Sequence, residues 1–329
     1  MTDIELAAFE ADIIAFCAEH EQSHGQERDY CACVTIESKK AKYFIKFYDS
    51  ETLWPEFSTQ SYIYEYAMRH RNGPRIPQPL HYFESQDECI AFLVMEYIEL
   101  ADHSLITNLA ERTAWALDWL SKVSAPPEDI MDPSKEAMGP VGGGFIRHRF
   151  FKNYQAPVSF QSVADLQFYM NEVRRCLYSF EYPPSDNIIF GQGLNLLPKL
   201  ATNPEKPIII INDPLIFTQS DMHVSNFGVD MSGNTVLLDF SDIGRLPLSF
   251  AKYNLQSRNK DSFIARVANI LCWPDNSNIS SMASVSNCLW MTSDPRLGAT
   301  TCVLEKMGVK LTFVIGLDED GRPKPKGKM

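Results

Sequence analysis

The chain lacks several patterns that define large functional classes. No apolar run approaches the roughly 20 residues that a membrane span requires. The eight cysteines include no C-x-x-C pair of the kind that holds zinc. Gly142 to Gly144 are not followed by the Gly-Lys-Ser/Thr of a phosphate-binding loop, and neither Ser220 nor Ser225 lies in a G-x-S-x-G nucleophile elbow. These absences count against membrane-spanning, zinc-dependent and serine-hydrolase functions.

Positive charge is also scarce. Lys and Arg number 30 against 42 Asp and Glu, which gives a formal net charge of −12. This balance argues against broad nucleic-acid binding. The N-terminus is acidic, with no basic segment before its apolar residues, so we expect no secretory signal and no membrane association. We therefore expect a cytoplasmic protein, and the basic cluster RPKPKGKM at its end predicts a flexible tail over 321–329.

Strand-like and helix-like patterns divide the chain into two parts. The first twenty residues predict a helix, and a second helix is predicted over 56–69, with Pro55 at its start. β-branched and aromatic residues predict four strands, over 31–38, 41–49, 79–85 and 89–99. After Leu100 the periodicity becomes helical, most clearly over 105–123 and 163–180, and helices are expected again between 260 and 320. The predicted domains are 1–98 and 99–320. Because the first is mostly strands and the second mostly helices, the expected fold class is α+β.

The most informative segment runs from Phe217 to Gly244. It places Asp221 five positions before Asn226 and eighteen before Asp239, with a predicted hairpin between the last two. An Asp can take the proton of an attacking hydroxyl, while Asn and Asp oxygens suit Mg²⁺, so this spacing indicates in-line phosphoryl transfer. The alternative for each of the three is a turn-forming role.

The same segment carries a family resemblance. The run QSDMHVSN over 219–226, followed by LDF over 238–240, resembles the H-G-D-x-H-x-x-N and following aspartate of the aminoglycoside phosphotransferase and choline kinase-like family within the protein-kinase-like superfamily. Gln219 departs from that pattern, which removes an imidazole that braces the loop. No G-x-G-x-x-G lies between residues 20 and 40.

The resemblance implies a bilobal fold, with a small antiparallel-sheet N-lobe and a larger helical C-lobe, and ATP and Mg²⁺ as cofactors. Asp221 would be catalytic, and Asn226 and Asp239 would bind the metal. The residues implied at the nucleotide are Lys46, Glu56, Glu96 and Ile98. Glu65 is the alternative carboxylate partner for Lys46, and Glu96 to Ile98 would connect the lobes and offer backbone groups to adenine.

The roles of His223 and Asp242 are less clear from the sequence. His223 has no second His or Cys at ligand spacing, so we expect it to order the loop by hydrogen bonding and not to bind a metal. Asp242 is a further candidate near the metal, but Ser241 stands where the family usually has an acid, so its role stays open.

The sequence thus predicts a phosphotransferase, or kinase, acting on a hydroxyl group of a small molecule. The alternative is a pseudokinase or nucleotide-binding interaction module, favoured by the missing glycines and by Gln219. A protein kinase is disfavoured because no A-P-E follows Asp239. We expect the acceptor to be framed by Arg147, His148, Arg149 and Tyr154; their positive charge favours an anionic acceptor, whereas the net negative charge favours a cationic one.

Overall fold

The first part of the chain folds into a four-stranded sheet with a helix on each face. The computed structural model describes residues 3–27, 30–37, 41–85, 90–126, 138–178, 206–257 and 259–291. The sheet has the order β1-β2-β4-β3, and neighbouring strands are antiparallel. Its elements are α1 (Asp3–His24), β1 (Cys33–Glu37), β2 (Lys42–Asp49), α2 (Ser50–His70), β3 (Pro79–Glu84) and β4 (Ile90–Glu96). The four predicted strands are confirmed, with ends that differ by a few residues.

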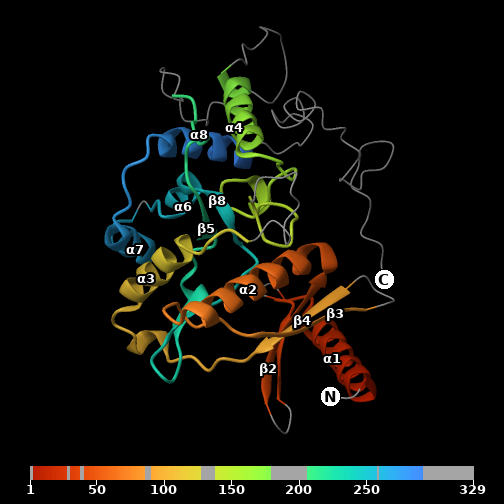
Figure 1. Ribbon diagram of the computed structural model, residues 1–329. Helices are drawn as coiled ribbons and strands as arrows, with labels where there is room; N and C mark the ends of the chain where they lie inside the picture. Colours follow the sequence, from red (N-terminus) through yellow and green to blue (C-terminus); the bar gives the residue numbers. More distant parts are fainter. Residues whose placement is uncertain are drawn as a thin grey trace, which may run out of the picture.

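Alternation along the strands gives this sheet two distinct faces. Ile45 and Phe47 of β2 pack in one cluster with Ile13 of α1. Phe44, on the other face, packs with Leu53 of α2. Lys46 alternates with the α1-facing residues, so it lies on the face covered by α2. Figure 1 shows α2 between the sheet and the second part of the chain, so this face is the one directed toward the larger lobe.

Helix α2 begins earlier than the sequence predicts. The prediction placed its start at Pro55, but α2 begins at Ser50 and contains the proline in its second turn. The carboxylate of Asp49 accepts hydrogen bonds from the Thr52 backbone N–H at 2.8 Å and from its hydroxyl at 3.0 Å. Such a cap contributes about 1 kcal/mol, and Asp49 therefore sets the helix start upstream of the proline.

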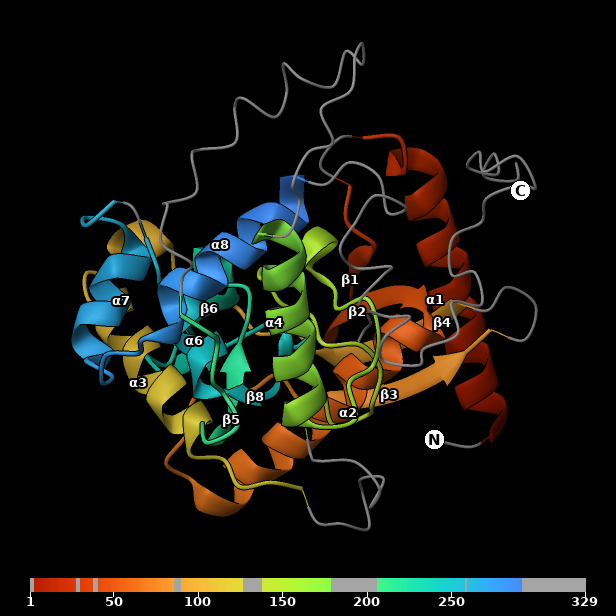
Figure 2. The ribbon, with the colours of Figure 1, turned by 90° about the horizontal axis from the view of Figure 1, so that it is seen from above.

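The second part of the chain is mainly helical, as predicted, with short strand pairs (Figures 1 and 2). Strand β5 pairs with β8 and strand β6 with β7, both antiparallel. Its elements are η1 (His103–Leu105), α3 (Leu109–Ser121), η2 (Lys152–Tyr154), α4 (Val163–Tyr178), β5 (Leu215–Gln219), η3 (Val224–Asn226), β6 (Phe227–Val229), β7 (Thr235–Leu237), β8 (Ile243–Pro247), α6 (Leu248–Asn254), α7 (Phe263–Leu271) and α8 (Asn278–Met291). The fold is the bilobal α+β arrangement expected from the sequence, with an antiparallel sheet in the smaller lobe and a mainly helical larger lobe.

The predictions for the C-terminal part of the chain are tested only in part. Helices α7 and α8 confirm helical structure up to 291, while the rest of the 260–320 expectation and the tail over 321–329 lie outside the described residues. The domain boundary at 98 and 99 follows the end of β4 closely but is not tested independently. In the described parts of the chain, no helix combines the length and apolar character needed to cross a bilayer.

Backbone and charge contacts join the hairpin β6–β7 to the sheet lobe. The Arg75 backbone N–H donates to the Thr235 carbonyl at 2.8 Å, and the Ala101 N–H donates to the Val229 carbonyl at 2.8 Å. The Arg75 guanidinium also donates to Asp230 Oδ2 at 2.6 Å and to the carboxylate of Glu96. Arg75 therefore links the end of β4 to the turn of a hairpin far along the chain.

Asp230 is the acceptor at the centre of this link. It accepts hydrogen bonds from Arg75 and from the backbone N–H groups of Ser232 and Asn234 at 2.9 and 2.8 Å. Burial alone would raise the pKa of Asp230, but hydrogen bonds from Asn234 and Arg75 lower it to about 2. The carboxylate is thus ionised across the neutral range, and its charge is satisfied within the fold.

Replacing Asp230 with Asn should lower the free energy of unfolding by about 2 kcal/mol at neutral pH, since hydrogen bonds to a charged group contribute about 1.5–3 kcal/mol. The folded pKa lies below the unfolded value of about 3.9, so this stability is present above that value and is lost as the pH falls toward the folded pKa. Urea midpoints of both proteins should converge between about pH 4 and pH 2. A gap that stays constant over that range would contradict the assignment, and Asp118→Asn, in an exposed ion pair, serves as the control.

Candidate functional site

Lys46 lies between two carboxylates. Its Nζ is 2.6 Å from Glu56 Oε1 and 2.7 Å from Asp239 Oδ1. The Glu56 side chain, on α2, is only 3% exposed, whereas Glu65, the alternative partner, is exposed and pairs with Arg69. Burial disfavours the charged ammonium, but the two carboxylates raise the pKa of Lys46 above its ordinary value. Lys46 is therefore a fixed positive charge where the two lobes meet.

Asp239 is held in a left-handed backbone conformation just after β7. Its φ of 54° is a region that non-glycine residues rarely adopt. Lys46 and the Ser241 hydroxyl, at 2.7 and 2.8 Å, both donate to its Oδ1. Burial would raise the pKa of Asp239, but Lys46 outweighs it and lowers the pKa below the usual range. Among the described residues no hydrogen bond reaches Oδ2, so an ionised oxygen is available to a cation.

Asp221 and Asn226 meet across the turn after β5. The amide nitrogen of Asn226 donates to Asp221 Oδ2 at 3.0 Å and to the Asp221 carbonyl at 3.2 Å. Because the amide nitrogen faces Asp221, the Asn226 Oδ1 is turned away from it, where its contact is the Ser225 hydroxyl at 3.4 Å. The loop thus presents one carboxylate and one amide oxygen. A carboxylate can accept a proton and an amide oxygen can bind Mg²⁺, and phosphoryl transfer requires groups of both kinds.

His223 orders this loop, as the sequence predicts. Its backbone N–H donates to Asp221 Oδ1 at 3.0 Å, and its Nδ1 lies 2.7 Å from the hydroxyl of Ser225 within η3. In the described segments, no group of three or more His, Cys, Asp or Glu side chains is placed to hold a metal ion. A cation at Asn226 and Asp239 would therefore need further ligands from a bound molecule, as Mg²⁺ does with nucleotide phosphates.

Gln219 joins the two acidic loops. Its Nε2 donates to the Asp239 carbonyl at 2.8 Å, and its Oε1 accepts from the Asp221 N–H at 3.0 Å. The Leu238 N–H donates to the Asn226 carbonyl at 2.9 Å, which holds the same loops together. The expectation that Gln219 leaves the loop without a brace is therefore wrong. A primary amide carries both a donor and an acceptor, and here it uses both.

Replacing Gln219 with Ala should reduce the turnover number by about 10- to 100-fold, because small displacements of reacting groups are that costly. Gln219→His, which can still donate and accept, should recover much of the loss. The measurement is steady-state kinetics on whichever acceptor the protein uses, with thermal unfolding as the folding check. A folded Gln219→Ala protein with an unchanged turnover number would show that this bridge does not position the site.

The end of β4 offers backbone groups to a ligand. The Glu96 carboxylate is occupied by Arg75 and by the Gln78 backbone N–H, so it does not face a nucleotide as a free charge. Ile98 is 9% exposed, and within the described residues its backbone N–H and C=O have no hydrogen-bond partner. Buried backbone groups are nearly always paired. The free pair at Ile98 therefore fits a ligand that supplies one donor and one acceptor.

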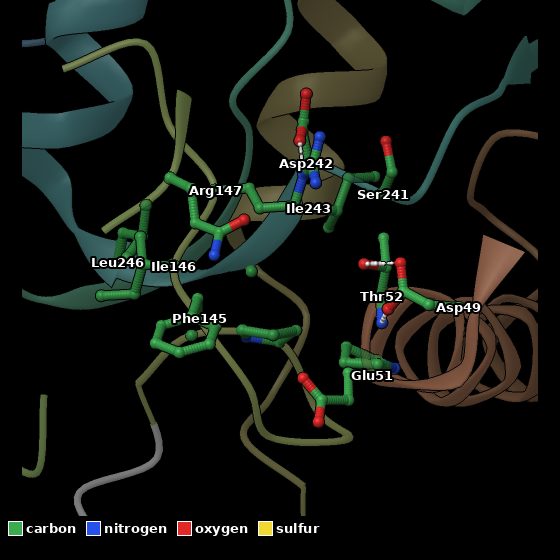
Figure 3. A pocket seen from close by; sticks show the side chains of 15 residues that line it. Asp49, Glu51, Thr52, Phe145, Ile146, Arg147, Ser241, Asp242, Ile243 and Leu246 are labelled. Atoms are coloured by element: carbon green, nitrogen blue, oxygen red, sulfur yellow. Dashed lines mark hydrogen bonds and ion pairs between the residues drawn. The ribbon is translucent and has the colours of Figure 1, made fainter. Parts of the chain in front are cut away.

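A pocket opens beside this site, where the start of α2 faces β8 (Figure 3). Arg147 Nε donates to Asp242 Oδ1 at 2.7 Å within it. Burial raises the pKa of Asp242 against the lowering effect of Arg147, and Asp239 and Asp221 add to the rise. The lining residues are Asp49, Glu51, Thr52, Pro55, Gly139, Pro140, Phe145, Ile146, Arg147, Gln155, Ser241, Asp242, Ile243, Gly244 and Leu246. Asp242 is thus paired with Arg147.

The four residues expected to frame an acceptor do not all line the pocket. Arg147 lines the pocket, but His148 is 1% exposed and contacts the Phe250 carbonyl. Burial lowers the pKa of His148 to about 3, so it is neutral. Arg149 donates to the carbonyls of Tyr253 and Gln256, and the Tyr154 ring packs on Trp290. The prediction is wrong for His148, Arg149 and Tyr154, because these side chains serve the packing of the larger lobe.

The Arg147–Asp242 pair was not predicted from the sequence. Its members are 95 positions apart, and no local pattern links them. Gln219 did carry a signal, because it stands where the motif resembled by this segment has a histidine.

Comparison with known proteins gives matches only among solved structures. No family model and no curated relative matches the sequence. One match is APH(2″)-IIia with GDP and kanamycin, at 11% identity, covering 82% of this chain and 86% of that chain with a TM-score of 0.43. Spectinomycin phosphotransferase APH(9)-Ia with AMP matches at 14% identity, covering 84% and 86%, with a TM-score of 0.41.

A thermostable mutant of aminoglycoside phosphotransferase APH(4)-Ia, with ADP and hygromycin B, also matches at 11% identity. It covers 88% of this chain and 95% of that chain with a TM-score of 0.45. These proteins are of the kind that the 219–240 motif resembles. At such identities and TM-scores, the assignment of a function rests on this chain's own contacts.

Proposed function

We propose that this chain is an ATP- and Mg²⁺-dependent phosphotransferase that transfers the γ-phosphoryl group to a hydroxyl of a small molecule. The observation that carries the proposal is the convergence around Lys46. Its ammonium joins Glu56 to Asp239, and Gln219 joins Asp239 to Asp221. An ammonium and the segments that carry two carboxylates are thus tied together, and they would supply the cation, the metal ligand and the proton acceptor that phosphoryl transfer uses.

Nucleotide binding would draw on both sides of the cleft. The free backbone N–H and C=O of Ile98, with the adjacent Glu96 carbonyl, suit the hydrogen-bonding edge of adenine. Lys46 would bind phosphate oxygens, held in place by Glu56, whose side chain is 3% exposed. The Glu56 carboxylate therefore acts by orienting Lys46 and not by touching the nucleotide.

Asn226 Oδ1 and Asp239 Oδ2 would hold the metal. Both are oxygen ligands without a strong competing contact in the described structure. Mg²⁺ bound there would neutralise charge on the phosphate oxygens during transfer.

Asp221 would orient the acceptor hydroxyl and take its proton. Each of its carboxylate oxygens already accepts one hydrogen bond, from the His223 N–H and from Asn226, which fixes the group's orientation. The acceptor oxygen forms the new bond to phosphorus, the bond from phosphorus to the β–γ bridging oxygen breaks, and the hydroxyl proton ends on Asp221. The pocket with Arg147 and Asp242 adjoins this position and is the proposed acceptor site.

Transfer of label from γ-³²P-ATP to a library of hydroxylated metabolites, with Mg²⁺ present, tests the proposal. The expected result is a labelled product whose formation requires both the metal and Asp221. Nucleotide binding without label transfer to any acceptor would instead support the alternative of a binding module. One structural observation favours that alternative: in the described part of the chain, β1 begins the sheet directly after α1, and no strand and glycine-rich loop precede it.

A further inference from the structure

Two cysteines meet at the start of β1. Cys31 Sγ and Cys33 Sγ are 3.0 Å apart. The Cys33 N–H donates to the Cys31 carbonyl at 2.8 Å, which closes a three-residue γ-turn through Ala32. In an extended strand, side chains two positions apart stand well separated, so this turn is what brings the sulfurs together. In the sequence alone, the alternation of Cys31, Ala32 and Cys33 favours one face of a strand over a redox pair, and the turn changes that interpretation.

This turn lies beside the strand that carries Lys46. Cys33 is the partner of Lys46 in the β1–β2 register, and directly opposed residues of antiparallel strands point to the same face. Cys33 is thus on the α2 face, with Lys46. Burial raises the pKa of the Cys33 thiol, and the charges of Lys46 and Asp239 make smaller, opposing contributions. The Phe47 N–H, donating to the Ala32 carbonyl at 3.0 Å, ties the turn to the strand that carries Lys46.

We propose that Cys31 and Cys33 are a redox modification site that closes to a disulfide with a low-molecular-weight disulfide such as oxidised glutathione as the oxidant. Cys31 is exposed, so its thiolate attacks one oxidant sulfur, forms a mixed disulfide and releases one thiol. The Cys33 sulfur then attacks the Cys31 sulfur, the mixed disulfide breaks, and the second thiol leaves. Two protein thiols are oxidised and one oxidant disulfide is reduced to two thiols.

Closure needs little movement of the chain. A disulfide bond is about 2.0 Å long. The two sulfurs are now 3.0 Å apart, so they must approach each other by about 1 Å. The bond would lock the turn in its present form, with the Cys33 N–H committed to the Cys31 carbonyl. In the dithiol form the turn is free to open and to offer the amides of Ala32 and Cys33 to phosphate oxygens beside Lys46.

Oxidation should therefore weaken nucleotide binding, a consequence that rests on the proposed function. Linkage requires the reverse effect as well: bound nucleotide should shift the equilibrium between disulfide and dithiol toward the dithiol by the same factor. In this proposal the turn over Cys31 to Cys33 supplies the phosphate-binding backbone that a glycine-rich loop would otherwise supply. The disulfide then controls whether that backbone is available.

The experiment treats the full-length protein with oxidised glutathione, then alkylates remaining thiols and digests with trypsin, which places both cysteines in the peptide over 29–39. The expected peptide lacks two hydrogens and carries no alkyl group, and reduction restores both thiols. Cys272→Ser, which removes another exposed cysteine, should behave as the unmodified chain. Cys31→Ser should form no such disulfide. Two alkylated cysteines in the oxidised sample would overturn the proposal.

The same samples are titrated with a fluorescent ATP analogue. Affinity should fall by about 10-fold on oxidation, within the usual range of coupling between sites. Cys31→Ser, which lacks the attacking thiol, should bind the analogue with the same affinity before and after exposure to the oxidant. Equal affinity for both forms of the unmodified chain would overturn the coupling. If the reduced protein binds no nucleotide, the proposed function fails, and the peptide mass still decides whether the disulfide forms.

Discussion

Replacing Asp221 with Asn should reduce the rate of phosphoryl transfer by about 10³-fold while leaving nucleotide affinity nearly unchanged. The amide keeps the size of the carboxylate but cannot take the hydroxyl proton, and general acid–base groups contribute about 10²- to 10⁴-fold. Asp221 contacts the loop through the His223 N–H and Asn226, and no contact joins it to Lys46 or to Ile98. This variant should therefore bind nucleotide almost normally but transfer the phosphoryl group slowly.

The measurement pairs single-turnover transfer with a nucleotide titration on the same preparation. Asp118→Asn is the matched control, because Asp118 lies in an exposed ion pair with Lys122 on α3, away from the site. A variant at position 221 that transfers phosphate at the original rate would remove Asp221 from the chemistry, whatever the effect on binding.

Replacing Lys46 with Met should abolish detectable transfer and also lower the free energy of unfolding by about 3–5 kcal/mol, the usual effect of removing one partner of a buried ion pair. Glu56 is 3% exposed, and without Lys46 it shares its surroundings with the Asp239 carboxylate. Burial already raises the pKa of Glu56. Without the ammonium, this carboxyl would be expected to take up a proton instead of staying charged.

The double variant Lys46→Met, Glu56→Gln separates stability from function. Removing the buried carboxylate should recover part of the lost stability, because no unpaired charge remains at that position, but transfer should stay absent. Urea unfolding and label transfer on the single and double variants give both readouts. Lys122→Met, in the exposed pair with Asp118, is the control. Recovery of activity together with stability would show that Lys46 serves only the fold.

The features that could be predicted from the sequence are those with a short-range signal. Runs of β-branched and aromatic residues predicted the four strands, and the spacing of Asp221, Asn226 and Asp239 placed them around a hairpin that the structure contains. The α2 start was missed because Pro55 looked like a first-turn residue, whereas the Asp49 cap, six positions earlier, sets the boundary.

Contacts between distant segments could not be predicted. The Arg147–Asp242 and Arg75–Asp230 pairs depend on how the lobes and loops come together, and a pair of opposite charges leaves no trace of its partner in one sequence. The meeting of Cys31 and Cys33 depends on a tight turn at a strand end, which an alternating pattern does not reveal. Of these contacts, the Arg147–Asp242 pair lines the pocket, and the Cys31–Cys33 turn leads into the strand that pairs with the one carrying Lys46.

A crystal structure of the protein with Mn²⁺ and a non-hydrolysable ATP analogue tests the central claim most directly. The account predicts an anomalous peak for the metal between Asn226 Oδ1 and Asp239, with Lys46 on the phosphates and adenine against the backbone of Ile98. A nucleotide bound elsewhere on the surface, or a metal coordinated by neither Asn226 nor Asp239, would contradict it.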